Sequence, residues 1–288
     1  MGDGKGLMAG RRGLVMGVAN DHSIAWGIAR ALAGHGAEVA FSYQGDAQAK
    51  RLKPLAAQIG SKILLPCDVE NDAQLDQLFR MLDSEWGELD FVVHALAHSD
   101  KSEMRGRYVD TTRTNFVRSL SVSCYSFTAV AQRAQHLMTA TGRGGALLTL
   151  TYLGASRVVP NYNVMGVAKA GLEASVRYLA ADLGRENIRV NAISAGPMRT
   201  LAGAVIGDSR TVFKWNKANS PLKKSVELEH VGNAALYLLS DLSAGVTGEI
   251  HFVDAGYHVV GMPSTQNLKG WAAENGEDTE GEKARVDA

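Results

Sequence analysis

Two phenol groups and one ammonium group are spaced in the sequence in a way that suggests chemistry. Tyr152 follows the apolar run 146–150, which is predicted to be a buried strand. Tyr162 and Lys169 lie seven residues apart in the Ala-rich segment 161–183, whose apolar residues have helical spacing. Two helical turns, roughly 10.5 Å of rise, would place both side chains on one face. They could then supply a proton donor and an electrostatic anchor. Alternatively, both lie at a helix surface with their polar ends in water.

The N-terminal part of the chain has the pattern of a nucleotide-binding unit. Residues 13–17 are predicted to form a short buried strand, followed by a turn and an amphipathic helix. In such a unit a diphosphate lies against the helix N-terminus, which Ser23 is predicted to cap. Only Gly17 and Gly27 remain of the usual glycine pattern, with Ala19 at the second position. The motif is therefore weak by itself.

Apolar runs alternate with amphipathic segments along most of the chain. Seven strands are predicted, at residues 13–17, 38–43, 62–66, 89–95, 146–150, 187–193 and 248–254. The longer helices are predicted at 71–86, 114–138, 161–183 and 227–240. This alternation predicts an α/β fold, a single-domain, Rossmann-like, doubly wound parallel sheet with helices on both faces.

The domain is expected to cover residues 1–263. Residues 199–224 contain few of the residues that usually mark the start or end of a helix or strand. They are expected to form a mobile lid over a lipophilic substrate. Residues 264–288 are rich in Gly, Glu, Asp and Asn, and are expected to form a flexible acidic tail.

The ends of the second and third predicted strands offer contacts for a dinucleotide. No acidic residue ends the second strand near Gln44, and no Lys or Arg follows before Lys50. The strand end therefore has no nearby positive charge to bind the 2′-phosphate of NADPH, which favours NADH over NADPH. Asp68, after the third strand, would either accept a hydrogen bond from an adenine amino group or cap the helix that begins near residue 71.

Composition excludes several classes of function. The 288 residues include 30 Lys and Arg and 30 Asp and Glu, and this balance argues against nucleic acid or an anionic membrane as the main partner. Cys67 and Cys124 are far apart, and the eight histidines form no HExxH pair, so no disulfide framework or metal site is predicted. No signal-peptide pattern and no run of about 18 apolar residues occurs. We therefore expect a soluble cytoplasmic protein.

The predicted lid region concentrates positive charge. It has one acid, Asp208, and six bases: Arg199, Arg210, Lys214, Lys217, Lys223 and Lys224. Such a cluster is commonly a solvated face, and the alternative is a docking patch for an acidic partner.

Three motifs together resemble the short-chain dehydrogenase/reductase superfamily, and within it the bacterial enoyl-acyl-carrier-protein reductases of the FabI type. They are YLGA at 152–155, PNYNVMGVAK at 160–169 and RVNAISAGPMRTLA at 189–202. Most of the superfamily separates its Tyr and Lys by three residues, whereas these reductases, like this chain, use six.

The resemblance implies an NADH-dependent homotetramer that reduces the trans-2 double bond of enoyl-acyl-carrier-protein thioesters in bacterial fatty-acid synthesis. It implies catalytic roles for Tyr152, Tyr162 and Lys169. The implied cofactor-binding residues are Gly17, Ser23, Ile24, Gln44, Asp68, Val69, Leu96, Lys169, Met198, Arg199, Thr200, Leu201 and Ala202. The implied substrate contacts are Ser99, Tyr152, Tyr162, Met165 and Ile206.

Three residues depart from the pattern of these reductases. Ala97 and His98 stand where a glycine and an apolar or aromatic residue are expected, and Ser209 stands where a bulky aromatic residue is common. Because acyl carrier proteins are strongly acidic, the resemblance also gives more weight to the docking interpretation of the basic lid region.

Two other functions are weighed against this interpretation. A carbonyl reductase of the same superfamily would have the short Tyr–Lys spacing and a Ser thirteen residues before the Tyr. Here Thr149 lies at that distance from Tyr162, but the spacing to Lys169 is the long one. A non-catalytic dinucleotide-binding protein would be expected to lack Tyr162 or Lys169.

Overall fold

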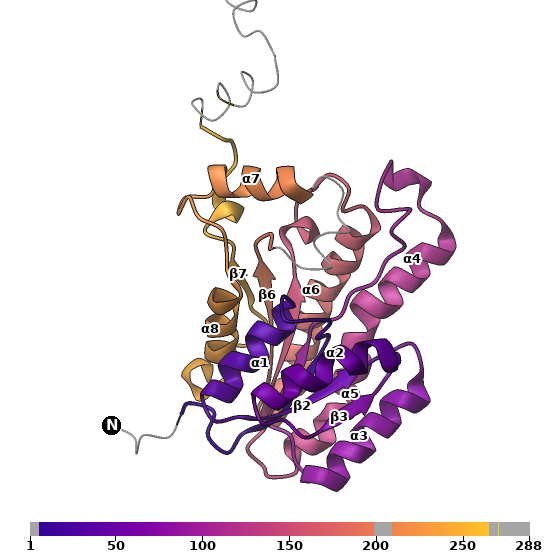
Figure 1. Ribbon diagram of the computed structural model, residues 1–288, viewed down its shortest axis with the longest axis vertical. Helices are drawn as coiled ribbons and strands as arrows, with labels where there is room; N and C mark the ends of the chain where they lie inside the picture. Colours follow the sequence, from indigo (N-terminus) through magenta and orange to yellow (C-terminus); the bar gives the residue numbers. More distant parts are fainter. Residues whose placement is uncertain (1–5, 199–208, 265–269, 271–288) are drawn as a thin grey trace, which may run out of the picture.

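The computed structural model describes residues 6–198, 209–264 and 270. Its centre is one parallel sheet of seven strands in the order β3-β2-β1-β4-β5-β6-β7 (Figure 1). The strands are β1 (Arg12–Met16), β2 (Glu38–Tyr43), β3 (Leu64–Pro66), β4 (Phe91–His94), β5 (Gly145–Thr151), β6 (Ile188–Ala195) and β7 (Ile250–Val253). The predicted doubly wound parallel sheet is confirmed. Because the strand order reverses between β1 and β4, the crevice for a ligand is expected at their carboxyl ends.

Helices cover both faces of the sheet. One face carries α1 (Ile24–Gly34), α2 (Gly45–Gln58) and α8 (Leu228–Leu239), and the other carries α3 (Asp72–Trp86), α5 (Ser126–Thr139) and α6 (Val164–Leu183). Alternate residues of β1 supply the two cores, since Leu14 and Met16 pack with α3 and α5 whereas Val15 packs with α1.

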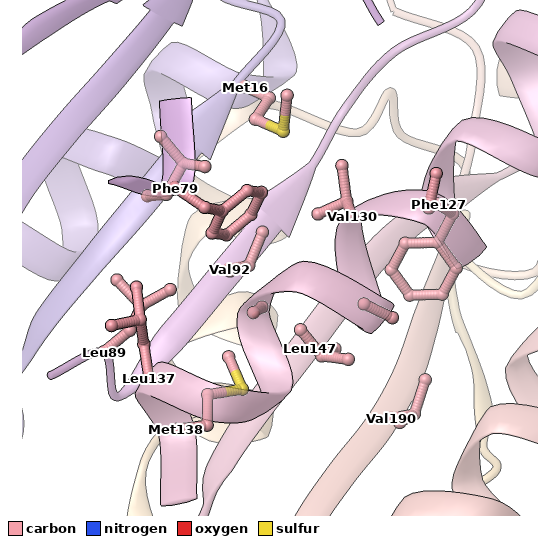
Figure 2. Close-up of a cluster of buried hydrophobic side chains, with 14 of the residues drawn as sticks. Met16, Phe79, Leu89, Val92, Phe127, Val130, Leu137, Met138, Leu147 and Val190 are labelled. Carbon is pink, nitrogen blue, oxygen red and sulfur yellow. The ribbon is translucent and has the colours of Figure 1, made fainter. Parts of the chain in front are cut away.

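Large apolar side chains fill the layer between the sheet and the helices α3 and α5. Figure 2 shows Phe79 from α3 and Val130 from α5 close to Met16, Val92 and Leu147 from the strands. The strand residues in this group are 1% exposed or less. Burial of each such side chain contributes roughly 1.5–3 kcal/mol, so this layer fixes the sheet edge on which the functional residues stand.

The single helix predicted over 114–138 is wrong in detail. The structure has α4 (Arg113–Leu120), a π-helical segment (Ser121–Tyr125) and then α5. Residues 121–126 include three serines, and Ser126 Oγ donates to the Val122 carbonyl at 2.6 Å. Hydroxyls that bond the backbone compete with regular helix hydrogen bonds, and π segments are frequent near functional sites.

The predicted lid contains more regular structure than its sequence suggested. A helix, α7 (Ser209–Asn219), lies at the top of the molecule in Figure 1, and Trp215 Nε1 donates to the Tyr257 hydroxyl at 3.0 Å. Lid residues 199–208, and all of the predicted tail except residues 264 and 270, lie outside the described residues. Within the part of the chain that is described, no helix is long and apolar enough to cross a membrane.

Candidate active site

A cavity of about 1570 Å³ lies at the carboxyl edge of the sheet. Its wall is formed by the turn after β1, the residues that follow β4, β5 and β6, and part of α7. The predicted site residues that line it are Gly17, Ser23, Ile24, Leu96, Ser99, Tyr152, Tyr162, Met165, Lys169 and Met198. Those that lie outside the described residues are Arg199, Thr200, Leu201, Ala202 and Ile206.

Tyr162 lies in a turn, not on the helix where it was predicted. Helix α6 begins at Val164, after Asn163, and both asparagines beside the tyrosine have positive φ, 60° at Asn161 and 43° at Asn163. Asparagine tolerates this conformation better than most residues. The turn places the Tyr162 side chain, only 7% exposed, in the cavity wall. Tyr162 and Lys169 therefore do share one site, but by way of a turn and not two helical turns.

The two tyrosines pack edge to face. Their ring centroids are 5.1 Å apart, with an interplanar angle of 72°, which is a favourable aromatic geometry. Gly154 makes the approach possible, because a Cβ at this position would overlap the ring of Tyr162. Both hydroxyl-bearing side chains thus stand together in the cavity wall.

Lys169 is held from the second turn of α6 at the floor of the cavity. The side chain is 5% exposed, and Nζ donates to the Leu150 carbonyl oxygen of β5 at 2.8 Å. An ammonium group has three N–H donors, so this bond orients the group and leaves two donors for a ligand.

Burial shifts the proton affinity of all three groups toward their neutral forms. It raises the pKa of Tyr152 to about 12 and the pKa of Tyr162 well above the ordinary value for tyrosine. Burial also lowers the pKa of Lys169 to about 8. At neutral pH both phenols therefore keep their protons and act as hydrogen-bond donors, while Lys169 remains mostly protonated.

The turn between β1 and α1 lines the cavity and leads into the N-terminus of α1. A Cβ at Gly17 (φ 97°) would overlap the carbonyl of Ala95, so only glycine fits there. Ser23 precedes α1, but its Oγ accepts from the N–H groups of Ala19 and Asn20 at 3.0 Å. Ser23 is the N-cap residue of α1, as predicted, but its side chain makes no capping hydrogen bond. The first-turn amides of a helix have no intrahelical acceptor, and Ile24 at this end of α1 lines the cavity.

The residues predicted to hold adenosine stand on the same edge of the sheet, outside the cavity lining. Gln44 follows β2, and Asp68 and Val69 follow β3. Asp68 does not cap α3, because Asn71 does so by accepting from the Gln74 amide at 3.2 Å. The capping alternative for Asp68 is wrong, and its contact with adenine stays a prediction.

Comparison with known proteins decides the family. A family model described as enoyl-(acyl carrier protein) reductase matches residues 17–258. The chain is 62% identical over 264 residues to enoyl-[acyl-carrier-protein] reductase [NADH] 2 of Rhizobium meliloti, covering 92% of this chain and 97% of that protein. It is 52% identical over 256 residues to the FabI enzyme of Rickettsia felis, covering 89% and 97%. The chain belongs to the enoyl-acyl-carrier-protein reductase family.

Solved structures agree with this assignment. The FabI crystal structure from Candidatus Liberibacter asiaticus has a TM-score of 0.87 and 58% identity, covering 90% of this reductase and 99% of that chain. The Anaplasma phagocytophilum enzyme, solved in complex with NAD, has a TM-score of 0.85 and 56% identity, covering 90% and 96%.

A buried polar cluster beneath the reductase's site had not been predicted. His94, at the end of β4, is fully buried, with Nε2 2.7 Å from Ser126 Oγ and Nδ1 3.2 Å from Thr149 Oγ1. Burial lowers the pKa of His94 to about 3, so the ring is neutral. The only sequence signal is a few polar residues inside apolar strands.

This cluster bears on the carbonyl-reductase alternative. The Thr149 hydroxyl also lies 3.0 Å from the His94 carbonyl oxygen, and Thr149 is absent from the residues that line the cavity. The hydroxyl thirteen residues before Tyr162 is therefore engaged in the interior, whereas Tyr152 lines the cavity.

Proposed function

We propose that this protein reduces the trans-2 double bond of enoyl-acyl-carrier-protein thioesters with NADH, as a step of bacterial type II fatty-acid synthesis. One observation carries the proposal. The buried, protonated hydroxyl of Tyr162 and the buried ammonium of Lys169 line one cavity, at the long spacing typical of enoyl reductases. The alternative, carbonyl reduction, is disfavoured by the engagement of Thr149 with His94.

The residues around the cavity fit NADH. Gly17 and the first turn of α1 form the cradle for the diphosphate, and Lys169 is placed to donate to the ribose of the nicotinamide half. Leu96 and Met198 line the cavity on the sides where the nicotinamide ring is expected. When bound, NADH would supply a hydride to C3 of the enoyl thioester and leave as NAD+, and uptake of a proton at C2 would complete the reduction.

The side chains of the protein then stabilise the charge that develops. Negative charge would build on the thioester oxygen as C3 is reduced, and Tyr162, whose side chain lines the cavity, would donate its O–H to that oxygen. Lys169 favours the same charge electrostatically, and both effects are strong because the groups are buried. Tyr162 can donate because burial keeps its pKa high.

The acyl chain would bind in the apolar part of the cavity. Tyr162, Met165 and Met104 form a buried cluster with Tyr152 packed against it. Ser99 lies in the wall beside this cluster, and its backbone would contact the substrate. Ile206, which the family resemblance also implies, lies outside the described residues.

The acidic carrier protein would dock on α7. Lys214 and Lys217 are exposed on this helix, and Lys214 lines the mouth of the cavity. A basic face at the entrance would draw the carrier toward the site through long-range attraction.

We further propose a homotetramer. Four apolar or aromatic side chains on α4, the π segment and α6 are exposed by 37–77%: Val117, Tyr125, Val167 and Tyr178. Large apolar side chains exposed on neighbouring elements are what a subunit interface would cover. Analytical ultracentrifugation would give about four times the 30.7 kDa chain mass, and a monomer would contradict the proposal.

We also propose a single-domain organisation and a cytoplasmic location for this protein. Residues 1–263 would form one NAD-binding reductase domain, with the lid at 199–224 and the acidic tail at 264–288. The protein would act in the cytoplasm.

One assay tests the proposed function. NADH oxidation is followed by absorbance with crotonyl thioester and, separately, with a panel of ketones, and both series are repeated with NADPH. We expect rapid oxidation of NADH with the enoyl thioester only. Faster turnover of a ketone would support the carbonyl-reductase alternative, and no turnover of any substrate would support a non-catalytic role.

A further inference from the structure

The two asparagines beside Tyr162 differ in one contact. Both have positive φ, but only Asn163 reaches another part of the cavity wall. Its Nδ2 donates to the carbonyl oxygens of Glu103 and Gly106, at 3.1 and 3.4 Å. Within the described part of the chain, the Asn161 side chain makes no hydrogen bond. These Nδ2 bonds tie the tyrosine turn to a segment 57–60 residues away in sequence.

That segment, residues 99–112, forms the outer side of the acyl pocket and is here called the wall segment. Its inward residue is Met104, 3% exposed, which packs with Tyr162 and Met165. Glu103 and Thr112 also line the cavity. Any outward movement of the wall segment would therefore open the packing around the catalytic phenol.

The wall segment is otherwise held by α4. The Glu103 carboxylate accepts from the Thr112 amide and hydroxyl at 3.0 and 2.8 Å, and from Asn115 Nδ2 at 3.1 Å. Asn115 Oδ1 accepts from the Asp100 amide at 2.9 Å. The Thr112 bonds lie within the wall segment and the Asn115 bonds fix it to α4, but none of them reaches Tyr162. Asn163 provides the polar link between the wall segment and the turn that carries Tyr162.

We infer that Asn163 is a positioning residue that couples the wall segment to Tyr162, so that acyl-chain binding and the aim of the catalytic hydroxyl are set together. Asn163 adjoins Tyr162 in the chain, so a shift of the wall segment is passed to the phenol across one peptide unit. The inference rests on the proposed role of Tyr162, and it assigns to Asn163 a function in both substrate binding and turnover.

Substitutions at the two asparagines separate the contact from the backbone conformation. Asn163→Asp keeps the size and the turn tolerance, but it sets carboxylate oxygens against two carbonyl oxygens. Asn163→Gly keeps the positive φ and removes the donor without repulsion. Asn161→Asp and Asn161→Gly are matched controls, because Asn161 also has a positive φ on the other side of the tyrosine.

Steady-state kinetics with crotonyl thioester and NADH measure the coupling. A displaced catalytic group costs up to about 100-fold in rate, so we expect Asn163→Asp to lower kcat/KM by about 10- to 100-fold, with a higher KM and a lower kcat. Asn163→Gly should also raise KM and lower kcat, but by smaller factors than Asn163→Asp. The Asn161 variants should stay near wild type, and NADH affinity should be unchanged in all four. Equal losses at Asn161 and Asn163 would overturn the inference.

Hydrogen exchange of the ligand-free protein tests the same link without activity. In Asn163→Asp and Asn163→Gly, the amides of residues 99–112 should exchange faster than in wild type, whereas both Asn161 variants should leave them unchanged. Unchanged exchange in both Asn163 variants would overturn the coupling. If wild type fails to reduce enoyl thioesters, the proposed function fails, but the exchange comparison still decides whether Asn163 holds the wall segment.

Discussion

The two sides of the cavity are built in opposite ways. The inner side, formed by Tyr152, Tyr162 and Lys169, is mostly buried and stands on strand ends and α6. The outer side, formed by the wall segment and α7, is mostly polar and exposed, with Asp100 and Lys214 in the lining. Charges interact strongly in a buried, low-dielectric environment, whereas exposed charges are screened by water and salt. Changes on the inner side should therefore alter the chemical step, and changes on the outer side should alter substrate recognition.

Among changes on the inner side of the cavity, Lys169→Met is expected to reduce activity the most. The substitution removes the proposed anchor for the nicotinamide ribose and the buried positive charge, so kcat/KM should fall on the order of 100-fold or more and NADH should bind more weakly. Kinetics and calorimetric NADH titration measure the two effects. Unaltered NADH affinity would contradict the assigned role of Lys169.

The same substitution should stabilise the ligand-free fold. Burial lowers the pKa of Lys169 from the ordinary 10.5 to about 8, which corresponds to a cost of about 3 kcal/mol at neutral pH, reduced in the variant by loss of the bond to Leu150. Lys169→Met should therefore have a higher Tm than wild type at pH 7.

The difference in stability between Lys169→Met and wild type should depend on pH, which tests whether the buried charge of Lys169 causes it. The folded state favours neutral Lys169, so between about pH 8 and 10.5 the unfolded state binds more protons. Wild-type stability therefore gains from this residue as pH rises through that window, and the advantage of Lys169→Met shrinks. A gap in Tm that is the same at pH 7 and pH 10 would show that the buried charge is not its cause.

A smaller loss is expected from Gly154→Ala. The added methyl would overlap the Tyr162 ring, so the phenol must shift, and kcat should fall about 10- to 100-fold with little change in NADH affinity. Gly184→Ala is the matched control, because a Cβ there meets nothing within 4 Å. Turnover at saturating crotonyl thioester measures the effect, and equal activity in the two variants would refute the packing argument.

The smallest effect should come from the outer side. Lys214→Glu with Lys217→Glu should raise KM for the carrier-bound substrate a few-fold at low salt, and less at high salt. KM for a coenzyme A thioester should stay near wild type. Lys53→Glu with Lys62→Glu makes the same change of charge at exposed residues that do not line the cavity. Equal effects of the first pair on both substrates would argue against carrier docking.

The apolar runs of the sequence predicted the sheet well, because each buried parallel strand is a short stretch of consecutive apolar residues. The second strand was predicted over the same residues as β2, and the helix over 71–86 differs from α3 by one residue. By contrast, the turn that carries Tyr162 depends on two asparagines with positive φ, a conformation imposed by the surrounding packing. Helical periodicity alone could not reveal it.

In the site too, the motif residues could be predicted from the sequence, whereas the contacts between distant residues could not. The motif spacing identified Tyr152, Tyr162 and Lys169, and the structure places all three in one cavity. The contact between His94 and Thr149 joins residues 55 positions apart, and the bond from Asn163 to Glu103 spans 60. Such contacts follow from how the elements pack, so no local signal in one sequence could predict them.

We expect the Tyr162 hydroxyl to stabilise the negative charge formed during hydride transfer. Single-turnover oxidation of bound NADH by excess crotonyl thioester tests it most directly, in wild type and Tyr162→Phe. Removal of one oxyanion donor typically costs about 100- to 1000-fold, so the rate should fall on the order of 100-fold while the Kd for NADH stays within about twofold of wild type. A single-turnover rate near that of wild type would contradict the account.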